Sequence, residues 1–505
     1  MSSSSIPPGR FVMVDLRGTE LDAAQADFLR KYGVRSVCLF RKNLVDERQM
    51  RRLTGDLLEV LGEHALIAID QEGGSVVRAT FVPQAPAAMA LGATCDEDLA
   101  RAVGAASARA LHALGCNWNF APVLDVNTNP ANPVIGERSF GQDPSDVARM
   151  AGAWMEGALA QGLACCVKHF PGHGDTHVDS HLDLPVVDKS MEQLGREEFV
   201  PFVGLRSKAP AVMTAHIVYP KLDPEFPATL SRRILGGVLR EAMAYEGVVI
   251  TDSLVMKAIY ERYGHGHAAV LALRAGADMV LALGSQQDQV LALEAIDDAL
   301  ASGELAGAAM EASLARLENL ASRYPARLGD YPETQRAQDE LLMQRTWAQA
   351  LTGLRSPQPP ARTDALRVIT QGEVPTDGIS EAGLSGHQVL SLFEGFADVE
   401  SMIVDALDGI DWRAVPRDRR RNVLVSNTHV RYRDPCPQSK IDLHMALWNP
   451  FQALDVPAPT VVSWGYASGA LLGMRAWLEG RAKLQGISPV QLEARTDTSF
   501  GSPNA

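Results

Sequence analysis

The feature that most limits the fold is an alternation of two patterns over roughly the first 330 residues. Short apolar runs rich in Val and Ile are typical of buried parallel strands, and longer Ala-, Leu-, Arg- and Glu-rich stretches with helical spacing separate them. The runs lie at 11–16, 34–40, 65–70, 117–125, 164–170, 211–218, 247–252 and 279–283. Eight strand–helix units in sequence predict an α/β fold of the (β/α)8, TIM-barrel type, although an open doubly wound sheet fits the same pattern.

The pattern changes after residue 330. Residues 331–365 read as a helical segment followed by a proline-rich linker at 356–363, which can form neither a helix nor a central strand. Apolar runs at 366–370, 422–425 and 460–463 then predict a smaller, sandwich-like α/β domain at 366–505, whose tail carries little pattern. A chain of 505 residues is long enough for this second domain beside a barrel at 1–330.

Charge and hydrophobicity limit the partners. The net charge of −14, from 47 basic and 61 acidic residues, argues against a nucleic-acid partner. No apolar run reaches the ~20 residues that span a bilayer, and no signal peptide is visible at the N-terminus. We therefore expect a cytoplasmic protein without a membrane partner. The sequence does not indicate an oligomeric state.

Polar residues occur where the predicted strands end. The carboxyl ends of parallel barrel strands meet at one face, where catalytic groups gather. Five of the predicted strands place chemistry-bearing side chains there: Asp70, Asp125, Lys168 with His169, His216, and Asp252. A single such residue is most often a helix cap, but five of them predict a common site.

The loop 168–181 is the densest of these features, with four of the twelve histidines. His173, His177 and His181 are spaced four apart, which on a helix would align three metal ligands. Pro171 and its neighbouring glycines argue against a helix. A metal-dependent hydrolase therefore stays open as the lesser alternative.

Two further residue types in this region suit acid–base and covalent chemistry. Asp179 lies two residues before His181 and can orient its imidazole, which can give and take a proton near neutrality. Asp252 ends a buried strand and is the best candidate for a nucleophile. The alternatives are an incidental Asp–His pair on a surface loop, and a helix cap at Asp252.

Five motifs together resemble glycoside hydrolase family 3, in its β-N-acetylhexosaminidase branch. They lie at 69–74 with Arg78, 119–127, 136–141, 168–181 and 250–254. The Asp-Ser-His ending of the fourth motif is the most specific, because the β-glucosidases of that family take their acid/base carboxylate from elsewhere. Many relatives carry a second Asp where this chain has Ser253, and the region 366–480 resembles the family's second domain only loosely.

The resemblance implies a role for each matching residue. Asp252 corresponds to the nucleophile that forms a covalent glycosyl-enzyme, His181 to the general acid/base, and Asp179 to its partner. The residues implied to hold the sugar in the −1 subsite, the pocket for the residue that is cleaved off, are Asp70, Arg78, Asp125, Arg138, Lys168, His169 and His216. No metal or other cofactor is implied.

The expected function is a retaining exo-β-N-acetylglucosaminidase that trims muropeptide or chitin-type oligosaccharides, as in cell-wall recycling. A β-N-acetylglucosaminide phosphorylase is an alternative, because a histidine acid/base repels phosphate less than a carboxylate does. Another family 3 β-glycosidase and a non-catalytic sugar-binding protein are the remaining alternatives. The sequence names neither the natural substrate nor a role for the C-terminal domain.

Overall fold

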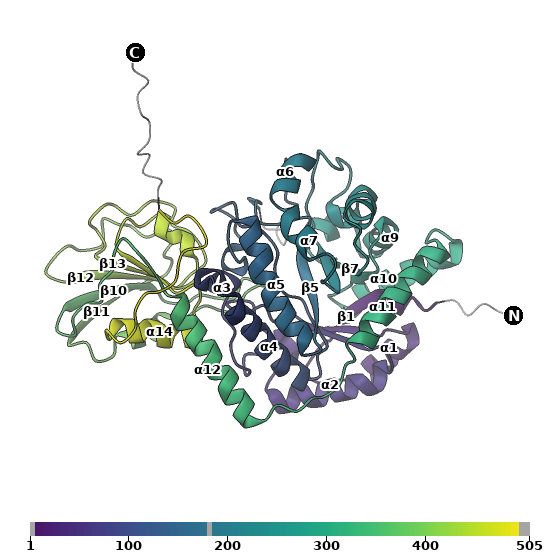
Figure 1. Ribbon diagram of the computed structural model, residues 1–505, viewed down its shortest axis with the longest axis horizontal. Helices are drawn as coiled ribbons and strands as arrows, with labels where there is room; N and C mark the ends of the chain where they lie inside the picture. The colour runs from purple at the N-terminus through teal and green to yellow at the C-terminus, as the bar shows by residue number, and fades with distance from the viewer. Residues whose placement is uncertain (1–5, 179–183, 494–505) are drawn as a thin grey trace, which may run out of the picture.

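The computed structural model describes residues 6–178 and 184–493. A barrel of strands ringed by helices occupies one end of an elongated molecule, and a second sheet occupies the other end (Figure 1). Helix α12 (Glu333–Ala350) runs between them.

The first eight strands form a closed barrel, and β1 pairs in parallel with both β2 and β8. The closed barrel confirms the prediction of a TIM-type fold, and the alternative of an open doubly wound sheet is wrong. The strands are β1 Val12–Asp15, β2 Ser36–Leu39, β3 Leu66–Ile69, β4 Trp118–Asn119, β5 Ala164–Phe170, β6 Ala211–Thr214, β7 Val248–Ser253 and β8 Met279–Leu281.

Strand β4 is much shorter than the expected 117–125. Its continuation contains Pro122, which has no backbone N–H to donate to a neighbouring strand. Only an isolated bridge between Val123 and Lys168 follows. The chain nevertheless continues along the barrel wall, so Asp125 still reaches the face where the strands end.

Helices surround the barrel, and aspartates cap several of them. Asp46, for example, accepts the Gln49 N–H at 2.8 Å at the start of α2. The barrel helices are α1 Ala23–Tyr32, α2 Glu47–Leu61, α3 Ala88–Thr94, α4 Glu97–Ala113, α5 Pro144–Ala160, α6 Met191–Arg196, α7 Phe199–Leu205, α8 Lys257–Tyr263, α9 His265–Ala275, α10 Gln286–Ser302 and α11 Gly307–Arg323, with a π-helix at Arg233–Ala242. Helices α4 and α5 can approach closely because Gly104 has no side chain. A Cβ at this position would lie 2.0 Å from the Trp154 carbonyl oxygen.

The second domain is built on one six-stranded sheet of order β11-β10-β12-β13-β14-β9. All its neighbours pair in parallel except β9, which pairs antiparallel with β14 at the edge. The strands are β9 Thr352–Leu354, β10 Ala365–Gln371, β11 Asp398–Val404, β12 Arg421–Ser426, β13 Leu443–Ala446 and β14 Thr460–Val462, and the helices are α13 Gly386–Leu390 and α14 Ser468–Leu478. The three predicted strands of this domain match β10, β12 and β14.

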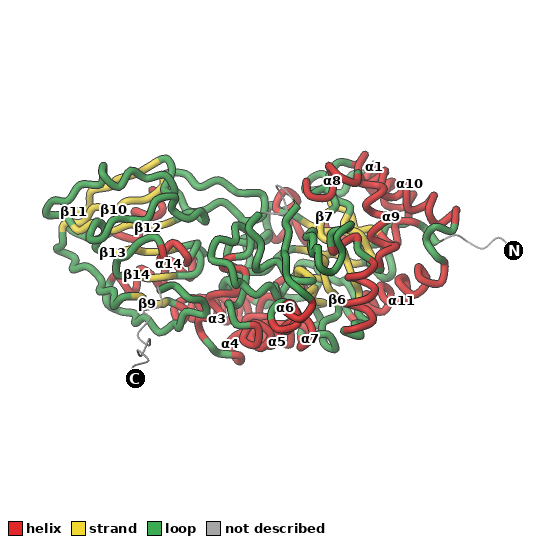
Figure 2. Tube along the Cα trace, turned by 90° about the horizontal axis from the view of Figure 1, so that it is seen from above, coloured by secondary structure: helices red, strands yellow, loops and turns green. Residues whose placement is uncertain are grey.

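The two halves share a hydrophobic cluster. Trp347 of α12 is fully buried in it, together with Met89 of α3 and with Phe451 and Trp464 of the second domain. Figure 2, a view turned by 90°, shows that loops also lie at the junction of the two halves. Across 6–178 and 184–493, no helix combines the length and apolar character that a membrane crossing requires.

Candidate active site

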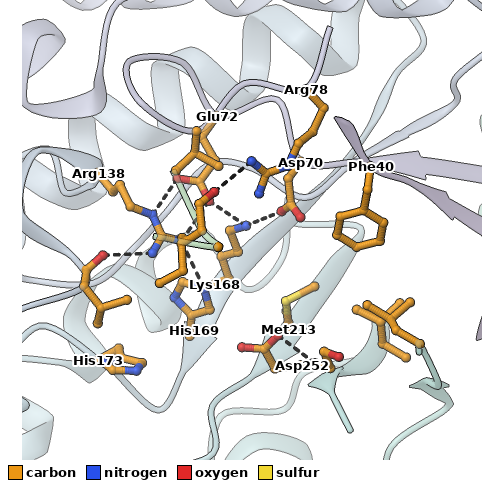
Figure 3. A pocket seen from close by; sticks show the side chains of 17 residues that line it. Phe40, Asp70, Glu72, Arg78, Arg138, Lys168, His169, His173, Met213 and Asp252 are labelled. Carbon is orange, nitrogen blue, oxygen red and sulfur yellow. Dashed lines mark hydrogen bonds and ion pairs between the residues drawn. The ribbon is translucent and has the colours of Figure 1, made fainter. Parts of the chain in front are cut away.

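A cavity opens where the barrel strands end, and both halves of the molecule line it. Charged side chains from the carboxyl ends of β3, β5 and β7 face one another across it (Figure 3). Its lining includes Phe40, Asp70, Glu72, Arg78, Arg138, Lys168, His169, His173, Met213 and Asp252 from the barrel, and Gly378 and Ile379 from the second domain. The strand ends therefore converge on one site, as expected for a barrel.

A network of opposite charges forms one wall of the cavity. The Lys168 Nζ lies 2.7 Å from Asp70 Oδ1 and 2.7 Å from Glu72 Oε1. The Arg138 guanidinium donates two parallel hydrogen bonds of 2.9 Å to the two oxygens of Glu72. Only 3% of the Lys168 side chain is exposed. Two cations and two carboxylates therefore neutralise one another where water is largely excluded.

The network keeps its members charged. Burial by itself raises the pKa of Glu72, but the charges of Arg138 and Lys168 outweigh it and hold that pKa well below its usual range. Burial lowers the pKa of Lys168, but Asp70 and Glu72 outweigh it, so the net shift is upward. The wall thus presents fixed charges and directed hydrogen-bond donors.

Asp125 lies behind the cavity and holds His169. Its carboxylate is fully buried, and Oδ2 lies 2.7 Å from His169 Nδ1. Its Oδ1 accepts the backbone N–H of His173 at 2.7 Å. Burial raises the pKa of Asp125, but His169 and His173 together outweigh that effect, and the net shift of this pKa is downward. Asp125 is not among the cavity-lining residues, so its contacts suit positioning of His169 rather than direct contact with a ligand.

Asp252 lies at the end of β7, beside Met213 and across the cavity from Arg138 and Glu72 (Figure 3). Its Oδ1 accepts the Ser253 backbone N–H at 2.7 Å. His216 does not line the cavity: it is fully buried, and its Nε2 lies 2.9 Å from the Ser253 carbonyl oxygen. His216 therefore supports the backbone directly after Asp252.

Arg78 connects the cavity to the second domain. Its Nη1 donates to the Ile379 carbonyl oxygen at 2.7 Å and lies 3.3 Å from Glu381 Oε1. The loop 376–382 thereby closes one side of the cavity with Gly378 and Ile379. No role for this loop could be predicted from the sequence, because nothing in its residues indicates which distant segment it would contact.

A buried carboxylate also joins the two halves, next to Arg138. Glu137 Oε1 accepts hydrogen bonds from Ser75 Oγ at 2.5 Å and from Trp448 Nε1, in the second domain, at 2.8 Å. The Trp448 ring packs 4.7 Å from that of Tyr466. Burial raises the pKa of Glu137, although Ser75, Trp448 and Arg138 partly oppose that rise. We call these four residues, Ser75, Glu137, Trp448 and Tyr466, the domain seam.

The histidine-rich loop is described only in part. His173 Nδ1 lies 2.8 Å from Thr176 Oγ1, and burial lowers the pKa of His173 to about 4. His177 Nδ1 lies 3.1 Å from Asn129 Nδ2. Asp179 and His181 lie outside the described residues. Within 6–178 and 184–493, no three His, Cys, Asp or Glu side chains are grouped as metal ligands would be.

Several residues that line the cavity were absent from the sequence prediction, and Glu72, Phe40 and Ile379 illustrate why. Glu72 lies two residues after Asp70 in the same motif, so its position was a usable signal. Phe40 ends an expected strand and could have been found by the same strand-end argument. Ile379 had no comparable signal, because it is brought in by contact between the two halves.

Comparison with known proteins identifies the chain's relatives. Residues 9–320 match the N-terminal domain of glycosyl hydrolase family 3. A β-hexosaminidase of Pseudomonas aeruginosa is 35% identical over 350 residues, which cover 69% of this chain and 98% of that protein. The β-hexosaminidase A of Pseudoalteromonas piscicida is 34% identical over 336 residues, and the match covers 61% of this chain and 56% of that longer protein.

The likeness extends over both halves in a solved structure. The family 3 β-N-acetylglucosaminidase from Paenibacillus sp. str. FPU-7 superposes with a TM-score of 0.87 at 30% identity, covering 97% of this chain and 99% of that one. The arrangement of barrel and second sheet is therefore shared with that enzyme.

Proposed function

The chain belongs to glycoside hydrolase family 3, and from that premise we propose that it is a retaining exo-β-N-acetylglucosaminidase. Its substrates would be muropeptide or chitin-type oligosaccharides with a terminal β-linked N-acetylglucosamine. The similarity to a β-hexosaminidase and to a β-N-acetylglucosaminidase supports this class of sugar. The cytoplasmic location inferred from the sequence stays a prediction.

One observation carries this proposal: a carboxylate, Asp252, faces a wall of buried charges across a cavity closed by the second domain. A sugar held against Asp70, Lys168 and His169 would have its ring fixed by hydrogen bonds. Such bonds can strengthen as the ring distorts toward the transition state. The closing loop 376–382 suits removal of a terminal residue rather than cleavage within a long chain.

Two displacements complete the reaction. In the first, the Asp252 carboxylate attacks the anomeric carbon while the glycosidic bond breaks and His181 protonates the departing oxygen. In the second, His181 takes a proton from water, whose oxygen attacks the anomeric carbon and releases the Asp252 carboxylate. Asp179 would orient His181 and stabilise its protonated form. The roles of Asp179 and His181 rest on the family resemblance, because both lie outside the described residues.

The test is a set of aryl β-glycosides of N-acetylglucosamine, N-acetylgalactosamine, glucose and xylose, assayed with and without phosphate. We expect hydrolysis of the N-acetylglucosaminide, and an about 10³-fold or greater loss of turnover in both Asp252→Ala and His181→Ala. Asp297→Ala, at an exposed position on α10, is the matched control.

Each alternative function predicts a different result. Phosphate-dependent release of sugar 1-phosphate would indicate a phosphorylase. Activity lost on chelation and restored by metal would indicate a metal-dependent hydrolase. Near wild-type turnover in either Asp252→Ala or His181→Ala would contradict the assigned mechanism.

A further inference from the structure

The segment that carries the expected acid/base, His181, leaves the barrel at the end of β5 and returns to it before α6. On the outgoing side, the Tyr219 hydroxyl donates a hydrogen bond to the Gly172 carbonyl oxygen. On the returning side, Val186 forms a parallel bridge with Val218, which follows β6. The barrel therefore holds both sides of the segment, and His181 lies between them in the sequence.

One lysine joins the two sides of this segment. Lys189, on the returning side, has its Nζ 3.0 Å from Asp175 Oδ2 on the outgoing side. The same Nζ donates to Glu197 Oε2 at 2.7 Å and contacts the Glu198 carboxylate. Only 14% of the Lys189 side chain is exposed, so dissolved salt screens these pairs less than it screens pairs on the open surface. We call these four residues the Lys189 cluster.

Glu198 attaches the Lys189 cluster to the barrel. It is buried directly before α7, and it packs against Gly172, where a Cβ would lie 2.6 Å from Glu198 Cγ. Burial raises the pKa of Glu198, and Lys189 opposes that rise only in part. Burial lowers the pKa of Lys189, but Glu197 and Glu198 outweigh it, so the net shift is upward. The cluster thus holds a charged ammonium group at a fixed place beside Asp175.

We propose that Lys189 is a positioning residue for the acid/base: by pairing with Asp175, it holds the segment so that His181 can protonate the departing oxygen. The inference rests on the proposed function, in which His181 is that acid/base. Fixing both ends of a chain segment limits the positions that the residues between them can take. Proton transfer needs the donor at about 2.6–3.2 Å from the oxygen, or one water away, so a loosened segment loses rate even when the sugar still binds.

The experiment uses two aryl β-N-acetylglucosaminides whose leaving groups differ in their need for a proton. 2,4-Dinitrophenolate is a weak base and departs without protonation, whereas phenolate is a stronger base and departs faster when an acid protonates its oxygen. For both substrates, kcat/KM reports the steps up to departure of the leaving group. A misplaced acid should therefore lower kcat/KM mainly for the phenyl glycoside. A defect in folding or in sugar binding should lower kcat/KM for both glycosides by the same factor.

Asp175→Asn is the principal variant, because it breaks the pair across the segment and leaves Lys189 in contact with Glu197 and Glu198. It is expected to lower kcat/KM about tenfold for the phenyl glycoside and less than about twofold for the dinitrophenyl glycoside. Lys189→Gln should show the same selectivity with a larger loss of stability, because Glu198 is left buried without its cation. If Asp175 and Lys189 act as a pair, the double variant should be no slower on the phenyl glycoside than Lys189→Gln alone.

Lys221→Gln is the matched control. Lys221 Nζ lies 3.3 Å from an oxygen of Asp188, the residue directly before Lys189, and 47% of the Lys221 side chain is exposed. This pair does not join the two sides of the segment, so its loss should change kcat/KM less than about twofold for either glycoside. Thermal denaturation of each variant shows that the protein assayed is folded.

His181→Ala separates the inference from the function on which it rests. A loss concentrated on the phenyl glycoside in both His181→Ala and Asp175→Asn supports the inference. If His181→Ala shows this selectivity but Asp175→Asn slows both glycosides equally, or neither, the inference is overturned and the proposed function stands. If the wild-type protein cleaves neither glycoside, or if His181→Ala slows both equally, the proposed function or its assignment of His181 fails, and the inference fails with it.

Discussion

Two buried glutamates lie in neighbouring regions of this protein and behave in opposite ways. About 6% of the Glu72 side chain is exposed, and Glu137 is 6% exposed. Glu72 faces Lys168 and Arg138 in the cavity wall, and its pKa falls. Glu137 accepts its hydrogen bonds from the neutral donors Ser75 and Trp448 in the domain seam, and its pKa rises.

The difference shows that burial alone does not decide the charge of a carboxylate. Burial disfavours the charged form at both positions, and two adjacent cations reverse the result at only one of them. The cavity wall therefore keeps fixed charges for use on a ligand. The domain seam uses a carboxylate as a hydrogen-bond acceptor between the two halves.

The largest expected effect comes from Glu72→Gln. The substitution removes the negative charge that both Lys168 Nζ and the Arg138 guanidinium contact, and leaves buried cations without full compensation. We expect a loss of about 3–5 kcal/mol in the free energy of unfolding. We also expect kcat/KM to fall at least about 10²-fold, because Lys168 and Arg138 lose their positions. Denaturant unfolding and steady-state kinetics measure the two effects. A variant with wild-type stability would show that the network is not strongly coupled.

The pH dependence of stability should have opposite slopes for the two glutamates. The folded-state pKa of Glu72 lies below the ordinary value of 4.5, so its contribution is full above that pH and is lost as pH falls through the folded pKa. The folded-state pKa of Glu137 lies above 4.5, so its contribution is full below that pH and is lost as pH rises through the folded pKa.

The measurement is the difference in Tm between wild type and each Glu→Gln variant from about pH 3 to pH 7. The advantage of wild type over Glu72→Gln should shrink toward acid pH, and its advantage over Glu137→Gln should grow. Slopes of the same sign would contradict the contrast between the two regions.

Trp448→Phe tests whether the domain seam supports the cavity. It removes the indole donor to Glu137 and part of a buried ring, so we expect a loss of about 1–3 kcal/mol in stability. A severalfold fall in kcat/KM should accompany this loss of stability, because Glu137 directly precedes Arg138 in the chain and Arg138 lines the cavity. Trp477→Phe, in the core of the second domain, is the control and should lower stability without changing kcat/KM. An equal kinetic effect in both variants would remove the special role of the domain seam.

The smallest expected effect is that of Glu137→Gln at pH 7. Glutamine keeps an oxygen that can accept from Ser75 and Trp448 and removes the cost of a buried charge. The free energy of unfolding should stay within about 1 kcal/mol of wild type, and kcat/KM within about threefold. A loss as large as that of Glu72→Gln would mean that the charge of Glu137 matters as much as that of Glu72.

The sequence predicted the barrel and much of the cavity because both depend on local signals. Apolar runs mark the strands, and the residue at each strand end is placed by the strand itself, as for Asp70, Lys168 and Asp252. The early end of β4 could be predicted only in part, because it depends on one proline, Pro122, within an otherwise apolar run. Ile379 and Trp448 could not be placed, because their roles arise from packing between segments that are far apart in the chain.

Strand β9 follows α12 directly, and it precedes the proline-rich segment 356–363 that marks the boundary in the sequence. Cleavage of the chain in that segment would leave β9 with the barrel and expose the unpaired edge of β14. It would also leave Trp347 on the barrel side without its packing against Gly465 and Gly469. Proteolysis or recombination at the boundary visible in the sequence would thus yield a second half prone to edge-to-edge association. To transfer the second domain to another protein intact, the transferred segment would have to begin with α12 and include β9.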